Sequence, residues 1–210
     1  MKRALFIWIP RTSGTSLWLN IEHCSKTSQR IIQNEHFDPN VEITTFQHWN
    51  LGQATWFFNI PDNWIESCWV FSIVRNSWDR LVSLYHILEQ GQPKQQELIR
   101  YLGGTFESFA EFLLSGRAPP VGPDGYAGGA FYGRPQFDWY RYRKPDYIGK
   151  FEELEVTWKE IEKHLGVPLS LVKANASIRK PYQEYYSPAL RDAIGEYYQE
   201  EISQFNYTFD

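Results

Sequence analysis

Residues 4–17 decide how this chain folds: Ala4-Leu-Phe-Ile-Trp-Ile9 is followed directly by Pro10-Arg-Thr-Ser-Gly-Thr-Ser-Leu17. The first six residues are apolar and rich in strand formers, which is typical of a strand buried on both faces of a sheet. The residues after them are mostly small and polar, and Leu17 begins a new apolar pattern. The stretch therefore predicts a strand, a tight loop and a helix.

The loop of residues 10–16 has the composition of an anion site. In a strand–loop–helix unit the loop amides and the helix N-terminus point at one place, which favours negative charge. The candidate phosphate ligands here are Arg11, Thr12, Ser13, Gly14, Thr15 and Ser16. The second glycine and the Lys-Ser/Thr pair of a nucleoside-triphosphate loop are absent, so the loop is P-loop-like only. An ordinary turn that binds nothing is the alternative.

The composition indicates a globular protein without a general affinity for polyanions. The chain has 210 residues, of which 42% are hydrophobic and 22% charged, with a net charge of −4. We therefore expect no nucleic-acid partner, and no stretch has the length of a membrane span. The first apolar run ends at Pro10, too early for a signal peptide, so a cytoplasmic protein is expected. Cys24 and Cys68 are expected to be reduced, and no Cys/His spacing indicates a metal site.

Strand and helix patterns alternate along the rest of the chain. Strands are expected at residues 29–33, 41–46, 68–74 and 146–151, and helices at residues 17–23, 62–67, 95–102, 106–114 and 153–164, after Arg75 and after Ser187. This alternation predicts a three-layer α/β fold with a central parallel sheet, as one domain over residues 1–210. A Gly/Pro-rich loop at about residues 115–135 suits a lid, a binding loop or a mobile segment.

A second candidate anion site begins at Arg75. Arg75 ends the clearest buried strand, and Ser83 lies about two turns into the helix that follows. A guanidinium and a hydroxyl placed in this way can bind one phosphate from two sides. An arginine at a helix start also forms ordinary ion pairs, so the pattern alone leaves both possibilities open. Together with the first loop, it suits a molecule that carries two separated phosphates.

These motifs resemble those of the sulfotransferases, which transfer a sulfuryl group from 3′-phosphoadenosine 5′-phosphosulfate (PAPS). Residues 10–17 are similar to the 5′-phosphosulfate loop of that family. Residues 74–83 are similar to its 3′-phosphate motif, which has an Arg-Asn-Pro start and a serine eight residues after the arginine. Further similarity at residues 147–154, 175–177 and 205–209 indicates the carbohydrate-type branch, in the family's order and spacing.

Two positions depart from the family pattern, and the resemblance implies a role for several others. Arg11 replaces the usual loop lysine, which keeps the charge but gives up a proton donor, and Ser77 replaces a proline.

The resemblance implies that Arg11 stabilises the leaving phosphate and that His48 removes the acceptor's proton. A histidine's ordinary pKa of about 6.5 suits that task. Glu42 and Glu35 are the alternative bases, and His48 also suits a structural role.

The resemblance also indicates how donor and acceptor are held. Arg75, Ser83, Arg179 and Lys180 are the candidates for the donor's 3′-phosphate, although Arg179 and Lys180 suit surface charge equally well. The expected partner is a hydroxylated acceptor, a carbohydrate or a glycan-like molecule. Candidate platforms for a sugar ring or for adenine are Trp49, Trp56, Trp64, Trp139, Tyr140 and Tyr142, and candidate cations for an acidic acceptor are Arg134, Arg141, Arg143 and Lys144.

Two other functions fit parts of the sequence. A P-loop-type kinase or phosphotransferase is one, although the chain lacks the Gly-Lys-Ser/Thr signature. A non-catalytic glycan-binding relative of the same fold is the other, because the chain is rich in aromatic residues.

Overall fold

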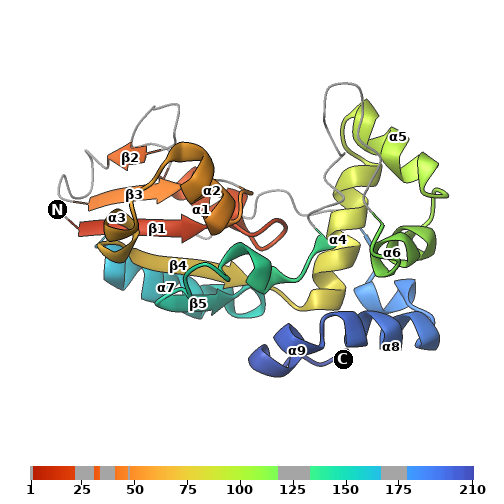
Figure 1. The fold of residues 1–210 in the computed structure, drawn as a ribbon. Coiled ribbons are helices and arrows are strands. Elements are labelled where there is room, and N and C mark those ends of the chain that lie inside the picture. Colours follow the sequence, from red (N-terminus) through yellow and green to blue (C-terminus); the bar gives the residue numbers. More distant parts are fainter. Residues whose placement is uncertain (1, 22–30, 34–40, 47, 118–132, 167–178) are drawn as a thin grey trace. The chain divides into compact units, whose positions relative to one another are not determined.

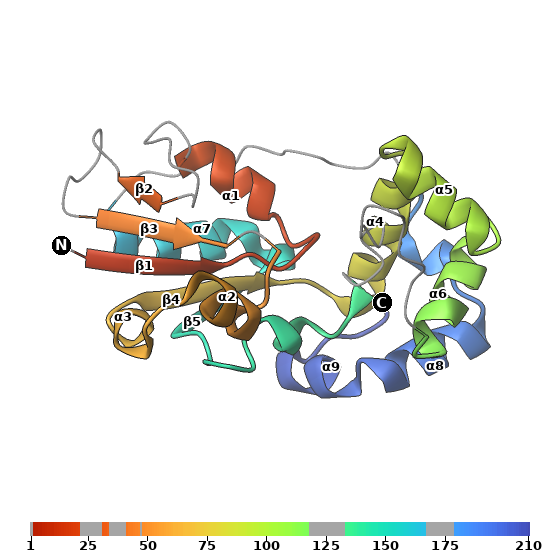
Figure 2. The same ribbon diagram turned by 45° about the horizontal axis from the view of Figure 1, so that its top comes forward.

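The computed structural model describes residues 2–21, 31–33, 41–46, 48–117, 133–166 and 179–210. The chain forms two compact units (Figures 1 and 2). The first unit is built from residues 1–75 and 136–176, and the second from residues 76–135 and 177–210. The chain therefore enters the second unit directly after Arg75, the residue at which the second candidate anion site begins.

A mixed five-stranded sheet is the centre of the first unit. Its strand order is β2-β3-β1-β4-β5. The parallel strands are β1 (Lys2–Ile7), β3 (Val41–Thr45), β4 (Trp69–Val74) and β5 (Tyr147–Lys150), and β2 (Ile31–Gln33) runs antiparallel to β3. The predicted α/β fold with a parallel sheet is confirmed for four strands. The edge strand β2 departs from it, because three residues carry no signal that fixes a strand's direction.

Helices cover both faces of this sheet. On one face, α1 (Gly14–Ile21) and α7 (Leu154–Leu165) contribute apolar side chains to a core that includes Phe6 of β1 and Phe71 of β4. Figures 1 and 2 show α2 (Leu51–Phe58) and α3 (Asp62–Glu66) on the other face. Two short 3-10 helices flank β5, namely η3 (Gln136–Trp139) and η4 (Phe151–Glu153).

The second unit is helical. Its elements are α4 (Ser77–Glu89), α5 (Pro93–Tyr101), α6 (Phe106–Leu114), η5 (Tyr182–Tyr185), α8 (Pro188–Tyr197) and α9 (Gln199–Phe205). Helix α4 is central, because α5, α6, η5 and α8 all pack against it. The sequence predicts a single last helix, and this prediction is wrong. The structure has two helices there, α8 and α9, which are divided at Tyr198. The bounds of α6 match the prediction.

The serine that replaces the family's proline makes a buried contact inside the second unit. The hydroxyl of Ser77 donates a hydrogen bond of 2.5 Å to Oε1 of Glu201, and both residues are 0% exposed. A buried carboxylate needs such donors, because it costs several kcal/mol when it is left without them. Ser77 therefore supports the packing of α9 against the start of α4.

Several sequence predictions lie outside the described residues. These are Cys24, Glu35, residues 175–177 and residues 118–132 of the Gly/Pro-rich loop. Within the described part of the chain, Cys68 is a buried thiol whose Sγ lies 3.3 Å from the carbonyl oxygen of Trp64. No helix in that part is long and apolar enough to cross a membrane. Its His, Cys, Asp and Glu side chains form no group of three or more that is placed to hold a metal ion.

Candidate functional site

The loop between β1 and α1 has an unusual backbone. Arg11 and Ser13 both have positive φ angles, of 69° and 74°, and Thr12 between them does not. Successive residues of alternating handedness turn their amide groups toward a common point, a concavity that binds anions. The backbone conformation thus supports an anion site independently of the composition of the loop.

Positive φ angles at Arg11 and Ser13 cannot be explained as the C-caps of helices. Among the described residues, the other non-glycine residues with positive φ are Asn59 and Asn206, and each of these ends a helix. Asparagine tolerates that conformation, which is common where helices end. Arg11 and Ser13 instead precede a helix, and each costs of the order of 1–3 kcal/mol. Strain of this kind concentrates at functional sites.

Internal contacts hold the loop in this shape. Oγ1 of Thr12, which is buried, donates a 2.9 Å hydrogen bond to the carbonyl oxygen of Ile9. The amide of Leu17 donates to the carbonyl oxygen of Ser13 at 3.1 Å, which begins α1. Thr12 therefore serves the shape of the loop, and Ser13 and Thr15 are its half-buried hydroxyl residues.

Gly14 is required by the packing of an aromatic side chain. A Cβ atom at this position would lie 1.9 Å from Nε1 of Trp8, a distance that real atoms do not reach. The indole of Trp8 therefore accounts for a glycine at this position. That indole also stacks on Trp18 of α1, with ring centroids 6.1 Å apart.

We expect Gly14→Ala to destabilise the first unit by about 1–3 kcal/mol, because the new methyl group displaces the Trp8 indole. The measurement is chemical denaturation followed by tryptophan fluorescence. Gly52→Ala is the matched control: its Cβ would meet its nearest neighbour at 3.6 Å, and alanine is favoured over glycine in a helix by about 0.5–1 kcal/mol. Equal stabilities of the two variants would contradict the packing argument.

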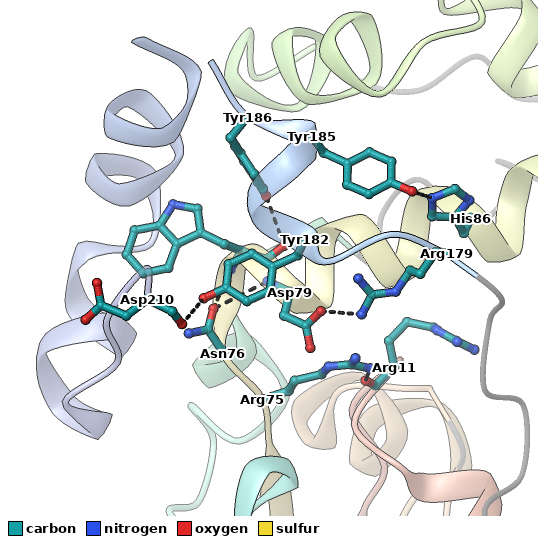
Figure 3. A network of polar contacts seen from close by, with 11 residues as sticks. Arg11, Arg75, Asn76, Asp79, His86, Arg179, Tyr182, Tyr185, Tyr186 and Asp210 are labelled. Atoms are coloured by element: carbon teal, nitrogen blue, oxygen red, sulfur yellow. Dashed lines mark hydrogen bonds and ion pairs between the residues drawn. The ribbon is translucent and has the colours of Figure 1, made fainter. Parts of the chain in front are cut away.

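Arg75 connects the end of β4 to the anion loop. Its Nη1 donates a 3.1 Å hydrogen bond to the carbonyl oxygen of Arg11 (Figure 3). Its guanidinium lies over the ring of Phe151, 3.9 Å from the centroid. Its backbone is held by Gln136, whose amide accepts from the Arg75 N–H at 2.9 Å and donates to the Arg75 carbonyl at 2.8 Å. Arg75 is thus a buried, oriented cation next to the loop.

His48 lies beside the same loop, just beyond the end of β3. Its ring meets the Trp8 ring edge-on, with centroids 5.4 Å apart, and its Nδ1 lies 3.4 Å from the carbonyl oxygen of Trp8. A carbonyl oxygen only accepts, so this contact places the proton of a neutral imidazole on Nδ1 and its lone pair on Nε2. The backbone oxygen of His48 accepts from Nε1 of Trp139 at 3.0 Å, which anchors this position.

The first unit therefore assembles the anion loop, His48 and Arg75, whereas three predicted ligands belong to the second unit. Ser83 is buried in α4. Arg179 forms an ion pair with Asp79 in the first turn of α4 (Figure 3). Lys180 is exposed and lies 3.5 Å from a carboxylate oxygen of Glu184. The alternative base Glu42 lies in β3.

The predicted aromatic platforms divide into core and surface residues. Trp139 and Tyr140 are buried and belong to the core, Trp64 is half-buried, and Trp49, Trp56 and Tyr142 are exposed. Two of the predicted cations make ion pairs: Arg141 with Asp138 at 3.2 Å and Arg143 with Asp146 at 3.0 Å.

Sequence reasoning missed three residues that shape this site. Trp8 packs between Gly14, Trp18 and His48, Phe151 lies under Arg75, and Gln136 holds the Arg75 backbone. Each makes contacts far away in sequence, and none lies in a polar motif. Only their proximity to quoted motifs could have pointed to them.

Comparison with known proteins identifies the fold. No family model matches the chain, and no curated protein matches its sequence. Among solved structures, it is similar to mouse sulfotransferase SULT7A1 complexed with PAP, with a TM-score of 0.55 and 14% identity over 96% of this chain and 84% of that one. At this identity the likeness concerns the fold: the chain has a sulfotransferase-like α/β fold.

Proposed function

We propose that this protein is a PAPS-dependent sulfotransferase that acts on a hydroxyl of a carbohydrate or glycan-like acceptor. The observation that carries the proposal is the strained loop at Arg11 and Ser13, tied to the buried cation of Arg75. Backbone strain of this kind clusters at functional sites, and the alternating handedness of the loop forms a concavity that binds anions. The fold supports the choice of donor, because a sulfotransferase of the same fold is the protein complexed with PAP.

The proposed reaction is an in-line transfer. The acceptor oxygen forms a bond to sulfur while the bond from sulfur to the donor's phosphate oxygen breaks, and the charge that develops moves onto the leaving phosphate. Arg11 and the loop amides stabilise that charge. Nε2 of His48 takes the proton of the acceptor hydroxyl. By the resemblance, the other phosphate of the donor is assigned to Arg75 and Ser83 of the 3′-phosphate motif and to the late basic pair Arg179 and Lys180.

The test is calorimetry with PAP, the desulfated donor, against ATP. We expect PAP to bind at least about tenfold more tightly than ATP without magnesium, because the two separate phosphate motifs of the sequence match two separated phosphates. Equal affinities for PAP and ATP would mean that the loop is a general anion site, and they would contradict the proposal. A magnesium-dependent preference for ATP would instead support the kinase alternative.

A further inference from the structure

Helix α2 presents aromatic side chains to solvent on the first unit. We call Trp49, Trp56, Phe57 and Phe58 the aromatic platform; their exposed fractions are 41%, 84%, 59% and 37%. Phe57 contacts Trp49 and Phe58, with centroid distances of 4.9 and 5.0 Å. Phe58 stacks on Phe46 at 5.5 Å, which anchors the platform beside the end of β3.

The platform is not a displaced part of the core. Helix α2 already buries one face through Leu51, Ala54 and Thr55. Trp56 and Phe57 stand on the other face, with Gln53 one turn before them. Burial of one such aromatic side chain stabilises by about 1.5–3 kcal/mol, so leaving several of them in water is unfavourable unless a ligand covers them.

The surroundings of the platform are polar but carry no surplus of positive charge. Residues 48–67 contain no lysine and no arginine. Gln53, Asn59 and Asn63 add exposed amide groups, and the hydroxyl of Tyr142 beside Gly52 donates to Asp62. The arginines that flank Tyr142 are each paired with an aspartate. Such a surface attracts neither an anionic lipid nor an acidic polysaccharide.

Aromatic rings combined with amides match the chemistry of a neutral sugar. The C–H face of a pyranose ring packs on an aromatic ring, and its hydroxyl groups exchange hydrogen bonds with amide and carboxylate groups. One residue of the platform is also the chain neighbour of the proposed base. Trp49 follows His48 in the chain, and its ring contacts Phe57 and Phe58.

We propose that the aromatic platform binds a neutral oligosaccharide, which it presents to His48 as the acceptor. The role of the saccharide as an acceptor rests on the proposed function. The binding of the saccharide to the platform does not depend on PAPS. The saccharide lies along the exposed face of α2, and its terminal hydroxyl is the nucleophile.

The test is calorimetry with three neutral hexasaccharides, cellohexaose, maltohexaose and N-acetylchitohexaose, and with a heparin hexasaccharide for comparison. We expect at least one neutral hexasaccharide to bind more tightly than the heparin one. Trp56→Ala and Phe57→Ala are each expected to weaken that binding about tenfold. Both side chains are exposed, so neither change should unfold the protein. Tyr101→Ala, which removes an aromatic ring that is 73% exposed on α5, is the matched control and should bind as the wild type does.

The outcomes separate this inference from the proposed function. Failure of all three neutral hexasaccharides at millimolar concentration would overturn the inference, as would unchanged binding by Trp56→Ala and Phe57→Ala. A dimer that these two variants dissociate, together with no saccharide binding, would overturn it in favour of a second copy of the chain. Saccharide binding without PAP binding would support the platform and reject the transferase. PAP binding without saccharide binding would support the transferase and reject the platform.

Discussion

Replacement of Arg75 by alanine is expected to weaken the binding of PAP about 100-fold, or ~3 kcal/mol. The guanidinium carries the charge assigned to a donor phosphate, and it also ties the loop to β4 through the carbonyl oxygen of Arg11. The change thus removes a charge-assisted hydrogen bond and releases a strained loop at once. Calorimetry of the purified variant with PAP gives the measurement.

Two further variants separate the possible causes. Arg75→Lys keeps the charge but loses the planar fork and its stacking on Phe151, so we expect an intermediate affinity. Arg141→Ala removes the same charge from an exposed position of the first unit and should leave PAP affinity unchanged. If Arg75→Ala binds PAP as the wild type does, Arg75 serves only the packing of β4.

The elements with a strong local pattern could be predicted from the sequence. The apolar runs of β1 and β4 are surrounded by turn residues, and α7 closely matches the helix expected at residues 153–164, with Gly166 ending it at a φ of 74°. Helix α2 could not be found in this way. Its solvent face carries Trp56 and Phe57, so apolar residues surround the helix and hide the spacing that marks an amphipathic helix.

The break between α8 and α9 was invisible for a related reason. The apolar stripe of Leu190, Ile194 and Ile202 continues across Tyr198, so its period does not change where the helix ends. The hydroxyl of Tyr198, a buried residue, donates to the carbonyl oxygen of Gly133, a contact over 65 residues. Tertiary contacts of this kind leave no local signature.

The site shows the same division between local and distant information. The loop composition pointed to Arg11 and its neighbours, because small polar residues after a strand have few other uses. The left-handed backbone at Arg11 and Ser13 could not be predicted, since neither residue is a glycine and the conformation opposes their local preference. The hydrogen bond from Arg75 to the carbonyl oxygen of Arg11 joins residues that are 64 positions apart in the sequence. Only the fold brings them together.

Replacement of His48 by alanine is expected to lower the rate of sulfuryl transfer about 100- to 10 000-fold, the usual contribution of a general base. The affinity for PAP should change little, because the proposed task of His48 is to take a proton from the acceptor and not to bind the donor. The rate is measured as release of PAP from PAPS in the presence of the neutral hexasaccharides. Calorimetry with PAP on the same variant gives the affinity.

His48→Gln decides between a base and a structural residue. The glutamine amide can still donate a hydrogen bond to the carbonyl oxygen of Trp8, as Nδ1 of His48 is placed to do, but it cannot accept a proton at neutral pH. A structural histidine would therefore be replaced by glutamine with little loss of rate. A base would lose as much with glutamine as with alanine, and added imidazole should restore part of the rate in the alanine variant. Full activity of His48→Gln would move the search for the base to Glu42.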